Sequence, residues 1–335
     1  MPRRVYSERL GEIGHDQFEA AVQRLGLGRF LGAEPITSGL FGQNVFVTTS
    51  EGKFVLRGAP HWVKGAGDEE YYQEDRWQFT KERYFAQQLH EHTNTPVPWP
   101  MLHDQSNDIF GWPYLIMPRM PGVSLDERTV LRELAPADRR SVAAALGRNL
   151  AEMQRLTSPI AGDFGVESIA LEEYPEGAVG SIAREADTFV QACGDRITLD
   201  EATWIAAAAA VAGGDGLITY VHCDYKLGNL TLLHDGGEWR VSGLFDFHEA
   251  RFADGALDIV RVACGYLDSE PDMARIFLDA YGKGIDPAHL TLYVLNDRLK
   301  IWSWFTHPDH ADPRLKGLTF RRWAQRYIDG LLALI

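Results

Sequence analysis

The sequence predicts an α+β protein in which a small β-rich N-terminal lobe precedes a larger, mostly helical C-terminal lobe. Two observations predict this order. Short runs of β-forming residues dominate the chain before residue 118, and apolar spacings typical of helices dominate it after residue 136. The 335 residues are 45% hydrophobic and 24% charged, an ordinary globular composition with enough chain for two lobes. We therefore expect an N-terminal lobe over 1–117, a hinge over 118–122 and a C-terminal lobe over 123–335.

The predicted N-terminal lobe contains five β-like runs and two helices. Phe18, Val22 and Leu25 recur at helical spacing, which predicts a first helix over 16–25 with Asp16 as its N-cap. A second, longer helix is predicted over 72–90, and the prolines that follow it end it. The β-like runs are 31–37, 44–49, 53–57, 101–102 and 114–117.

The predicted C-terminal lobe is helical except around one polar stretch. That stretch lies between β-like runs at 217–222, 230–233 and 239–245, with a turn at 235–237. The predicted helices are 138–156, 182–193, 201–211, 258–266, 272–282, 287–304 and 318–332.

Composition excludes several classes of function. The net charge of −14 disfavours nucleic acid as a partner and favours a cationic small molecule. The longest apolar run, 204–212, is too short to span a bilayer. Three cysteines stand far apart without a CxxC pair, which favours a reduced, cytoplasmic protein without a disulfide framework or a zinc site. The oligomeric state stays open.

The stretch from His222 to Asn229, followed by Asp246, carries the chemistry. It has the pattern H-x-D-x-K-x-x-N, and then an Asp directly after an apolar run. Phosphoryl transfer needs a carboxylate that accepts or orients the acceptor hydroxyl proton, and oxygen ligands for Mg²⁺. Asp224 is the candidate base, and Asn229 with Asp246 are the candidate Mg²⁺ ligands. Lys226 is the candidate cation for the transferred phosphate, with an exposed loop lysine as the alternative.

Neighbouring residues of this stretch have supporting interpretations. His222 is expected to pack and brace the loop rather than to react, and Cys223 to be a packed thiol rather than a nucleophile. We call the stretch 222–229 the catalytic loop. Asp258 begins an apolar helix, so we expect it to hydrogen-bond the backbone of the catalytic loop, to cap the helix, or to do both.

Nucleotide-binding residues are expected in the N-terminal lobe. Arg57 ends a β-like run, and Glu82 lies on the long helix; a strand cation paired with a helix carboxylate would bind phosphates. Gly39 and Gly42 would let backbone N–H groups approach phosphates, although an ordinary hairpin turn explains them almost as well. The chain contains no GxxxxGK[ST] stretch, which excludes a Walker-type phosphate loop.

Taken together, these residues resemble the aminoglycoside phosphotransferase family within the protein-kinase-like superfamily. The resemblance also includes Pro96 and Pro98 in the segment 95–98, and the β-like run 113–117. It implies a bilobal protein-kinase-like fold whose N-terminal lobe has an antiparallel five-stranded sheet, and it implies ATP, or GTP, with Mg²⁺ as cofactors. It also implies that the C=O of Pro118 and the N–H of Met120 meet the adenine.

The sequence departs from the family at three positions. Cys223 stands where the family usually has Gly, Arg57 replaces the lysine of many kinases, and Lys226 is the residue expected in protein Ser/Thr kinases. A protein kinase is nevertheless disfavoured, because the segment between Asp246 and Asp258 is too short for an activation segment.

The predicted function is ATP- and Mg²⁺-dependent phosphorylation of a hydroxyl on a small polar molecule. An aminoglycoside or aminocyclitol is the leading class, as in antibiotic resistance, and Asp163 and Glu249 are candidate carboxylates for its amines. Choline, homoserine, methylthioribose and macrolides stay open, because the fold does not fix the substrate. A catalytically silent nucleotide-binding protein is the alternative from another class.

Overall fold

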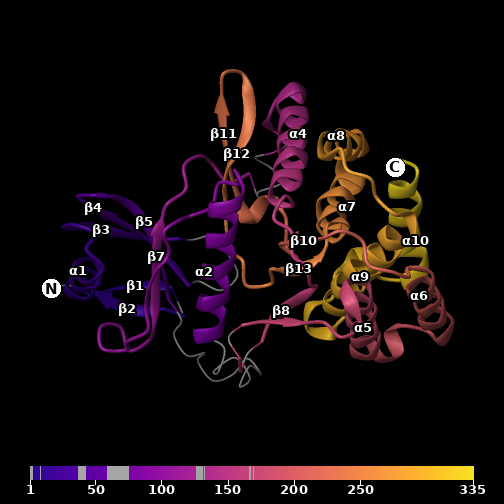
Figure 1. The fold of residues 1–335 in the computed structure, drawn as a ribbon, viewed down its shortest axis with the longest axis horizontal. Coiled ribbons are helices and arrows are strands. Elements are labelled where there is room, and N and C mark those ends of the chain that lie inside the picture. The colour runs from indigo at the N-terminus through magenta and orange to yellow at the C-terminus, as the bar shows by residue number, and fades with distance from the viewer. Residues whose placement is uncertain are drawn as a thin grey trace.

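The chain forms an α+β structure in which an antiparallel sheet at the N-terminal end adjoins a larger, mainly helical part (Figure 1). This computed structural model describes residues 3–7, 9–36, 43–58, 75–125, 131, 133–165, 167–168 and 170–335. The predicted fold class is confirmed. Within the described residues, no helix is long and apolar enough to cross a membrane.

The N-terminal sheet has five strands, all paired in antiparallel fashion, as the sequence predicts. Their spatial order is β3 (Phe30–Pro35), β4 (Asn44–Thr49), β5 (Gly52–Gly58), β7 (Tyr114–Pro118) and β6 (Leu102–Asp104). Thr49 pairs with Gly52, so a tight turn joins β4 to β5. The buried residues Val45, Val47 and Leu56 form one apolar cluster with residues of the first helix.

The sequence did not predict a short hairpin before the sheet. It consists of β1 (Arg3–Ser7) and β2 (Gly11–Gly14) and leads directly into α1 (His15–Arg24). The predicted N-cap at Asp16 is wrong, because Gly14 occupies that position and its N–H donates to Gln17 Oε1 at 2.9 Å. Within α1, Phe18 is buried and its ring stacks on that of Phe30.

The long helix α2 (Asp75–His92) joins the two parts of the molecule. It lies between the sheet and the helical region (Figure 1). Phe85 on α2 is fully buried, and its ring lies 5.5 Å from both Tyr220 and Phe252, which belong to the C-terminal part. The ion pair between Lys81 Nζ of α2 and Asp163 Oδ1, at 2.6 Å, is a second contact between these parts. Residues of α2 are therefore held against the catalytic part of the chain.

Beyond β7, the segment predicted as a hinge docks onto a hairpin of the C-terminal part. The hairpin consists of β11 (Leu230–Asp235) and β12 (Glu238–Leu244). Val123 and Leu232 exchange two backbone hydrogen bonds of 2.9 Å. Gly122, directly before this contact, has φ +103°, and a Cβ there would lie 2.4 Å from the carbonyl oxygen of Leu232.

Gly122→Ala is expected to lower the free energy of unfolding by about 3 kcal/mol. Left-handed backbone strain and a backbone clash act together at this position. Gly111→Ala is the matched control, because Gly111 has φ +86° but no atom within 4 Å of the added Cβ, so it should cost only about 1 kcal/mol. Denaturant unfolding of both variants measures the difference. Equal losses would contradict a steric contribution at Gly122.

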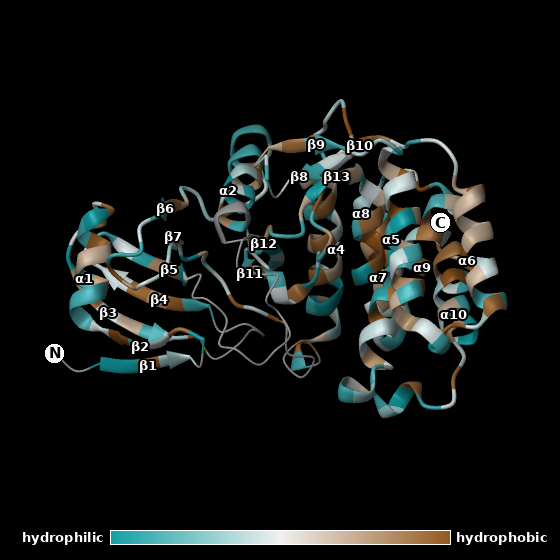
Figure 2. Cartoon of the chain, turned by 90° about the horizontal axis from the view of Figure 1, so that it is seen from below, coloured by the Kyte–Doolittle hydropathy of each residue, from teal (hydrophilic) through white to brown (hydrophobic). Residues whose placement is uncertain are grey.

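The C-terminal part packs its helices around a common apolar core. Figure 2 shows apolar stretches on α5, α7 and α9. Gly147 lets α4 approach α8 closely, since a Cβ there would lie 2.3 Å from the carbonyl oxygen of Phe277. The helices are α4 (Pro136–Met153), α5 (Gly177–Cys193), α6 (Leu199–Val211), α7 (Ile259–Ser269), α8 (Pro271–Tyr281), α9 (Pro287–Phe305) and α10 (Phe320–Leu332).

A small sheet crosses this part of the molecule and carries the catalytic loop. Its order is β10 (Ile218–Val221), β13 (Arg251–Asp254), β8 (Gly162–Phe164) and β9 (Leu171–Glu173). The sequence predicted β10 but not the other three strands. Each of those has only three or four residues, which is too short for an alternating pattern to stand out.

Candidate active site

The catalytic loop begins where β10 ends and is held by one buried carboxylate. Asp258, at the end of the 3-10 helix η4 (Gly255–Asp258), accepts the N–H of His222 at 2.6 Å and the N–H of Cys223 at 2.8 Å. Cys223 has φ 63°, so the chain turns sharply just before Asp224. The predicted bracing role of Asp258 is confirmed, whereas its side chain makes no capping hydrogen bond to α7.

His222 and Cys223 occupy structural positions. His222 is fully buried and its Nε2 lies 3.0 Å from the carbonyl oxygen of Phe245, while burial lowers the pKa of its ring. Arg251 Nε donates to Cys223 Sγ at 3.1 Å, and burial raises the pKa of this thiol to about 12. A thiol that stays protonated at neutral pH is a poor nucleophile, which agrees with the sequence interpretation.

Asp224 lies at the centre of a polar cluster and remains 16% exposed. Its Oδ2 is 2.7 Å from Lys226 Nζ and accepts from Asn229 Nδ2 at 3.0 Å. Its Oδ1 lies 3.6 Å from Arg261 Nη1. The two predicted catalytic side chains, Asp224 and Lys226, are thus in direct contact, and an arginine that the sequence analysis did not select stands on the other side.

The two predicted metal ligands lie on adjacent backbone segments. Asn229 ends the 3-10 helix η3 (Leu227–Asn229), and its C=O accepts the N–H of Phe245, which precedes Asp246, at 3.1 Å. Asn229 Nδ2 donates to the carbonyl and the carboxylate of Asp224, so its amide oxygen is the atom left for a cation. Among the described residues no three His, Cys, Asp or Glu side chains converge on a metal site. One amide and one carboxylate fit Mg²⁺, which keeps waters and phosphate oxygens as its other ligands.

Arg57 of β5 links Glu82 on α2 to Asp246. Its Nη2 lies 3.0 Å from Glu82 Oε1 and 3.1 Å from Asp246 Oδ1. The predicted Arg57–Glu82 contact is therefore present, with both side chains buried. Burial raises the pKa of Glu82 although Arg57 opposes the shift. For Asp246 burial alone would raise the pKa, but the Arg57 charge and the His248 hydrogen bond hold it below its usual range.

Two further predicted nucleotide residues lie at and just after the end of strand β7. Pro118 ends β7 opposite Phe54, and Met120 follows within the predicted hinge, where it packs against Gly243. Within the described residues, the N–H of Met120 makes no backbone hydrogen bond, so it is a donor available to a base. Gly39 and Gly42 lie outside the described residues.

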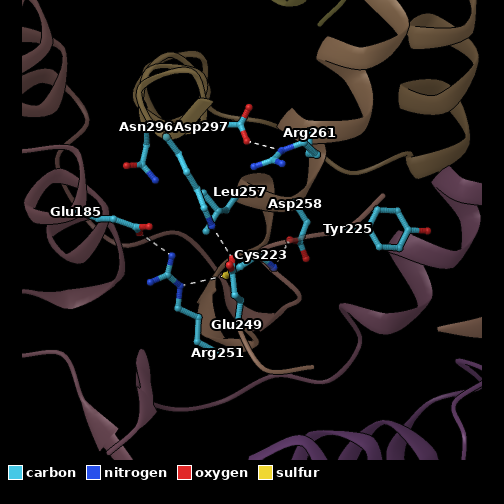
Figure 3. A pocket seen from close by; sticks show the side chains of 11 residues that line it. Glu185, Cys223, Tyr225, Glu249, Arg251, Leu257, Asp258, Arg261, Asn296 and Asp297 are labelled. Carbon is cyan, nitrogen blue, oxygen red and sulfur yellow. Dashed lines mark hydrogen bonds and ion pairs between the residues drawn. The ribbon is translucent and has the colours of Figure 1, made fainter. Parts of the chain in front are cut away.

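A small pocket of about 30 Å³, partly open to solvent, lies beside the catalytic loop (Figure 3). Glu249, predicted as a substrate carboxylate, lines it and is bound by Lys300 at 2.7 Å. Asp163, the other predicted carboxylate, pairs with Lys81 of α2 and does not line this pocket. The full lining is Glu185, Cys223, Tyr225, Glu249, Arg251, Leu257, Asp258, Arg261, Asn296, Asp297 and Lys300.

Sequence reasoning did not select several charged residues of the site, of which Arg261, Lys300 and His248 are the closest to its chemistry. Arg261 carried a usable signal. It follows Asp258 by three residues on an apolar helix, so both project from the same side of that helix toward the catalytic loop. Lys300 carried no such signal, because the contact of α9 with the catalytic loop depends on tertiary packing.

Asp258 is expected to make stability depend on pH. Burial raises its pKa to about 7 although hydrogen bonds from His222 and Cys223 oppose the shift. Because this folded-state pKa exceeds the unfolded value of 3.8, the group favours folding most at low pH. That contribution is lost as pH rises from about 4 through about 7, by roughly 1.4 kcal/mol per pH unit at most.

The measurement is denaturant unfolding of the wild type and of Asp258→Asn between pH 5 and pH 8. The free-energy advantage of the wild type over the variant should shrink as pH rises across this range. A constant difference would show that Asp258 titrates outside it.

Comparisons with known proteins agree with this geometry. A model of the phosphotransferase enzyme family matches residues 32–293. No curated protein matches the chain. An aminoglycoside phosphotransferase solved with GDP and kanamycin superposes with a TM-score of 0.60 at 16% identity, covering 96% of this chain and 97% of that one. These similarities are too remote in sequence to show more than a shared fold.

Two further structures have the same fold. A macrolide 2′-phosphotransferase from Brachybacterium faecium has a TM-score of 0.60 and 15% identity, covering 94% of this chain and 98% of its own. A spectinomycin phosphotransferase solved with ADP and spectinomycin has a TM-score of 0.56 and 12% identity, covering 96% and 98%. The matched family segment spans well over half of the chain, and it confirms the resemblance seen in the sequence. The chain therefore belongs to the phosphotransferase enzyme family and is a phosphotransferase.

Proposed function

We propose that this phosphotransferase moves the γ-phosphoryl group of ATP, with Mg²⁺, to a hydroxyl of a small polar molecule. The observation that carries the proposal is the convergence at the catalytic loop. Asp224 contacts Asn229 and Lys226, and Asn229 adjoins the segment of Asp246, which Arg57 ties to the N-terminal sheet. One cluster of side chains would thus supply a carboxylate base, metal ligands and phosphate-facing cations.

Each side chain has a distinct role in the proposed reaction. Asp224 accepts or orients the proton of the acceptor hydroxyl as its oxygen attacks phosphorus. Lys226, 2.7 Å from Asp224, neutralises charge on the group in transfer. Arg57 binds nucleotide phosphates and is kept in place by the buried Glu82. Pro118 C=O and Met120 N–H bind the adenine edge, and a phosphate-binding role for Gly39 and Gly42 is assigned from the sequence alone.

The metal-binding role is assigned to Asn229 and Asp246. When bound, Mg²⁺ supplies charge neutralisation on the β- and γ-phosphates. Arg57 and His248 both contact Asp246 Oδ1, so its Oδ2 is the oxygen left for the cation. Two protein ligands leave most of the coordination shell to water and phosphate oxygens, as Mg²⁺ prefers.

Aminoglycosides and aminocyclitols are the first acceptors to test. Kanamycin and spectinomycin occupy structures of the same fold, and the acidic chain favours cationic ligands over long distances. Macrolides, choline, homoserine and methylthioribose belong in the same panel, because a shared fold does not define the acceptor.

The test measures ADP release with ATP or GTP across this panel, with and without EDTA. We expect acceptor-dependent ADP release that EDTA abolishes. Nucleotide binding without ADP release under any acceptor would instead support a catalytically silent binding protein. ADP release that persists in EDTA would remove Asn229 and Asp246 as metal ligands.

A further inference from the structure

Three cations line the pocket beside the catalytic loop. They are Arg251 of β13, Arg261 of α7 and Lys300 of α9, so three separate elements direct positive charge to one place. Figure 3 shows Arg251 and Arg261 on either side of the catalytic-loop residues. Arg261 Nη1 also lies 3.6 Å from the carboxylate oxygen Oδ1 of Asp224. The reacting hydroxyl would therefore arrive next to a guanidinium.

The carboxylates of this pocket are already paired within the chain. Glu185 binds Arg251 at 2.7 Å, and Glu249 binds Lys300 at 2.7 Å. Burial opposes charge on Glu249 and on Lys300, yet their contact lowers the pKa of Glu249 and raises that of Lys300. Both groups of this pair are thus ionised at neutral pH, and an incoming ammonium group would have to displace a cation that the fold holds in place.

The other two carboxylates of the pocket, Asp297 and Asp258, are also bound by groups of the chain itself. Asp297 Oδ1 accepts from Arg261 Nε at 2.6 Å, and its other oxygen is held by Arg298. The two oxygens of Asp258 accept the N–H groups of the catalytic loop. Although the whole chain has a negative net charge, each carboxylate of this pocket already has a partner within the protein.

Unused hydrogen-bond donors remain on two of these cations. Lys300 has three N–H donors and uses one of them on Glu249, and Arg261 Nη2 makes no hydrogen bond within the described residues. An oxygen-rich, negatively charged group matches these unused donors best, because charge-assisted hydrogen bonds are the strong ones. A polycation would supply further donors and like charge.

One buried amide points to a hydroxylated ligand. Asn296 of α9 lines the pocket and is 5% exposed, and its Oδ1 has no hydrogen-bond partner among the described residues. A buried acceptor without a partner is costly, and a ligand hydroxyl would satisfy it.

We propose that the acceptor is a small hydroxylated acid, anionic at neutral pH, whose acidic group binds Lys300 and Arg261 while its hydroxyl faces Asp224. This inference rests on the proposed phosphotransfer and names the substrate class of that site. It departs from the polycationic class that net charge alone suggests, because the local pairing of charges decides what enters the pocket.

The first experiment sorts natural acceptors by charge without assuming their identity. The small-molecule extract of the organism that encodes this chain is separated at pH 7 into anion-retained, cation-retained and unretained fractions. Each fraction is incubated with enzyme, ATP and Mg²⁺, and acceptor-dependent ADP is measured against Asp224→Asn as the blank. We expect the activity in the anion-retained fraction. Activity in either of the other two fractions would overturn the inference and leave phosphotransfer standing, whereas no activity in any fraction would overturn both.

The second experiment removes the proposed anion contact without leaving an unpaired charge. In the double variant Lys300→Met with Glu249→Gln, both members of the ion pair become neutral. The amount of the anion-retained fraction that gives half-maximal rate should rise at least about tenfold. The KM for ATP should stay within about twofold. Lys316→Met, on the exposed segment before α10, is the matched control and should change neither value. An unchanged acceptor requirement in the double variant would contradict a role for Lys300.

Discussion

Replacing Asp224 by asparagine is expected to lower kcat by about 10²–10⁴-fold while ATP binding stays within about twofold. The amide cannot accept the proton of the attacking hydroxyl, yet it keeps the size of the carboxylate. The hydrogen bonds from Asn229 Nδ2 reach both the backbone carbonyl and Oδ2 of Asp224, so the carbonyl contact at 2.9 Å survives the substitution. Steady-state ADP release and a nucleotide-binding titration provide the two readouts.

The control for this prediction is Asp235→Asn at the exposed end of β11, beside the turn of the β11–β12 hairpin. Asp235 pairs only loosely with Arg240 at the surface, so this variant should keep wild-type kcat. An Asp224→Asn enzyme with undiminished turnover would remove Asp224 as the base. Loss of nucleotide binding together with turnover would instead indicate a collapsed loop.

Replacing Arg57 by methionine should produce the largest loss of stability, about 3–5 kcal/mol in the free energy of unfolding. Arg57 and Glu82 have side-chain exposures of 8% and 2%, and Arg57 also neutralises Asp246. Without the guanidinium, two nearby carboxylates would lack their shared cation in a largely dry site. The KM for ATP should rise at least about tenfold as well, because phosphate binding loses its cation.

Arg29→Met is the matched control, because Arg29 is exposed just before β3 and its loss should change stability by less than about 0.5 kcal/mol. Denaturant unfolding separates the two variants. A second variant, Arg57→Lys, keeps the charge and should recover part of the stability. If Arg57→Met were as stable as Arg29→Met, the Arg57–Glu82–Asp246 network would not hold the two parts of the site together.

The sequence predicted the parts of this site that are encoded locally. The spacing from Asp224 to Asn229 sits within one loop, and the apolar run before Asp246 marks a strand end, so both could be recognised without the fold. The strands β4, β5 and β7 of the N-terminal sheet and the long helices were also predictable, because each has a sustained run or period of apolar residues.

Most contacts between distant segments could not be predicted. Lys81 and Asp163 belong to different parts of the molecule, and only tertiary packing shows that Asp163 is bound by a buried lysine instead of facing a substrate. The pairing of Glu249 with Lys300 is similar. Such pairs decide the charge of the acceptor pocket, so net charge, which sums over the whole surface, was a poor guide to the local field.

Phosphoryl transfer at this site is tested by following the label of [γ-³²P]ATP after incubation with Mg²⁺ and acceptors, for the wild type and for Asp224→Asn. We expect label to appear in a small-molecule product with wild-type enzyme, EDTA to prevent this, and Asp224→Asn to reduce it by at least about 100-fold. Label that stays in ATP, or that appears only as inorganic phosphate with every acceptor, would contradict phosphoryl transfer at this site.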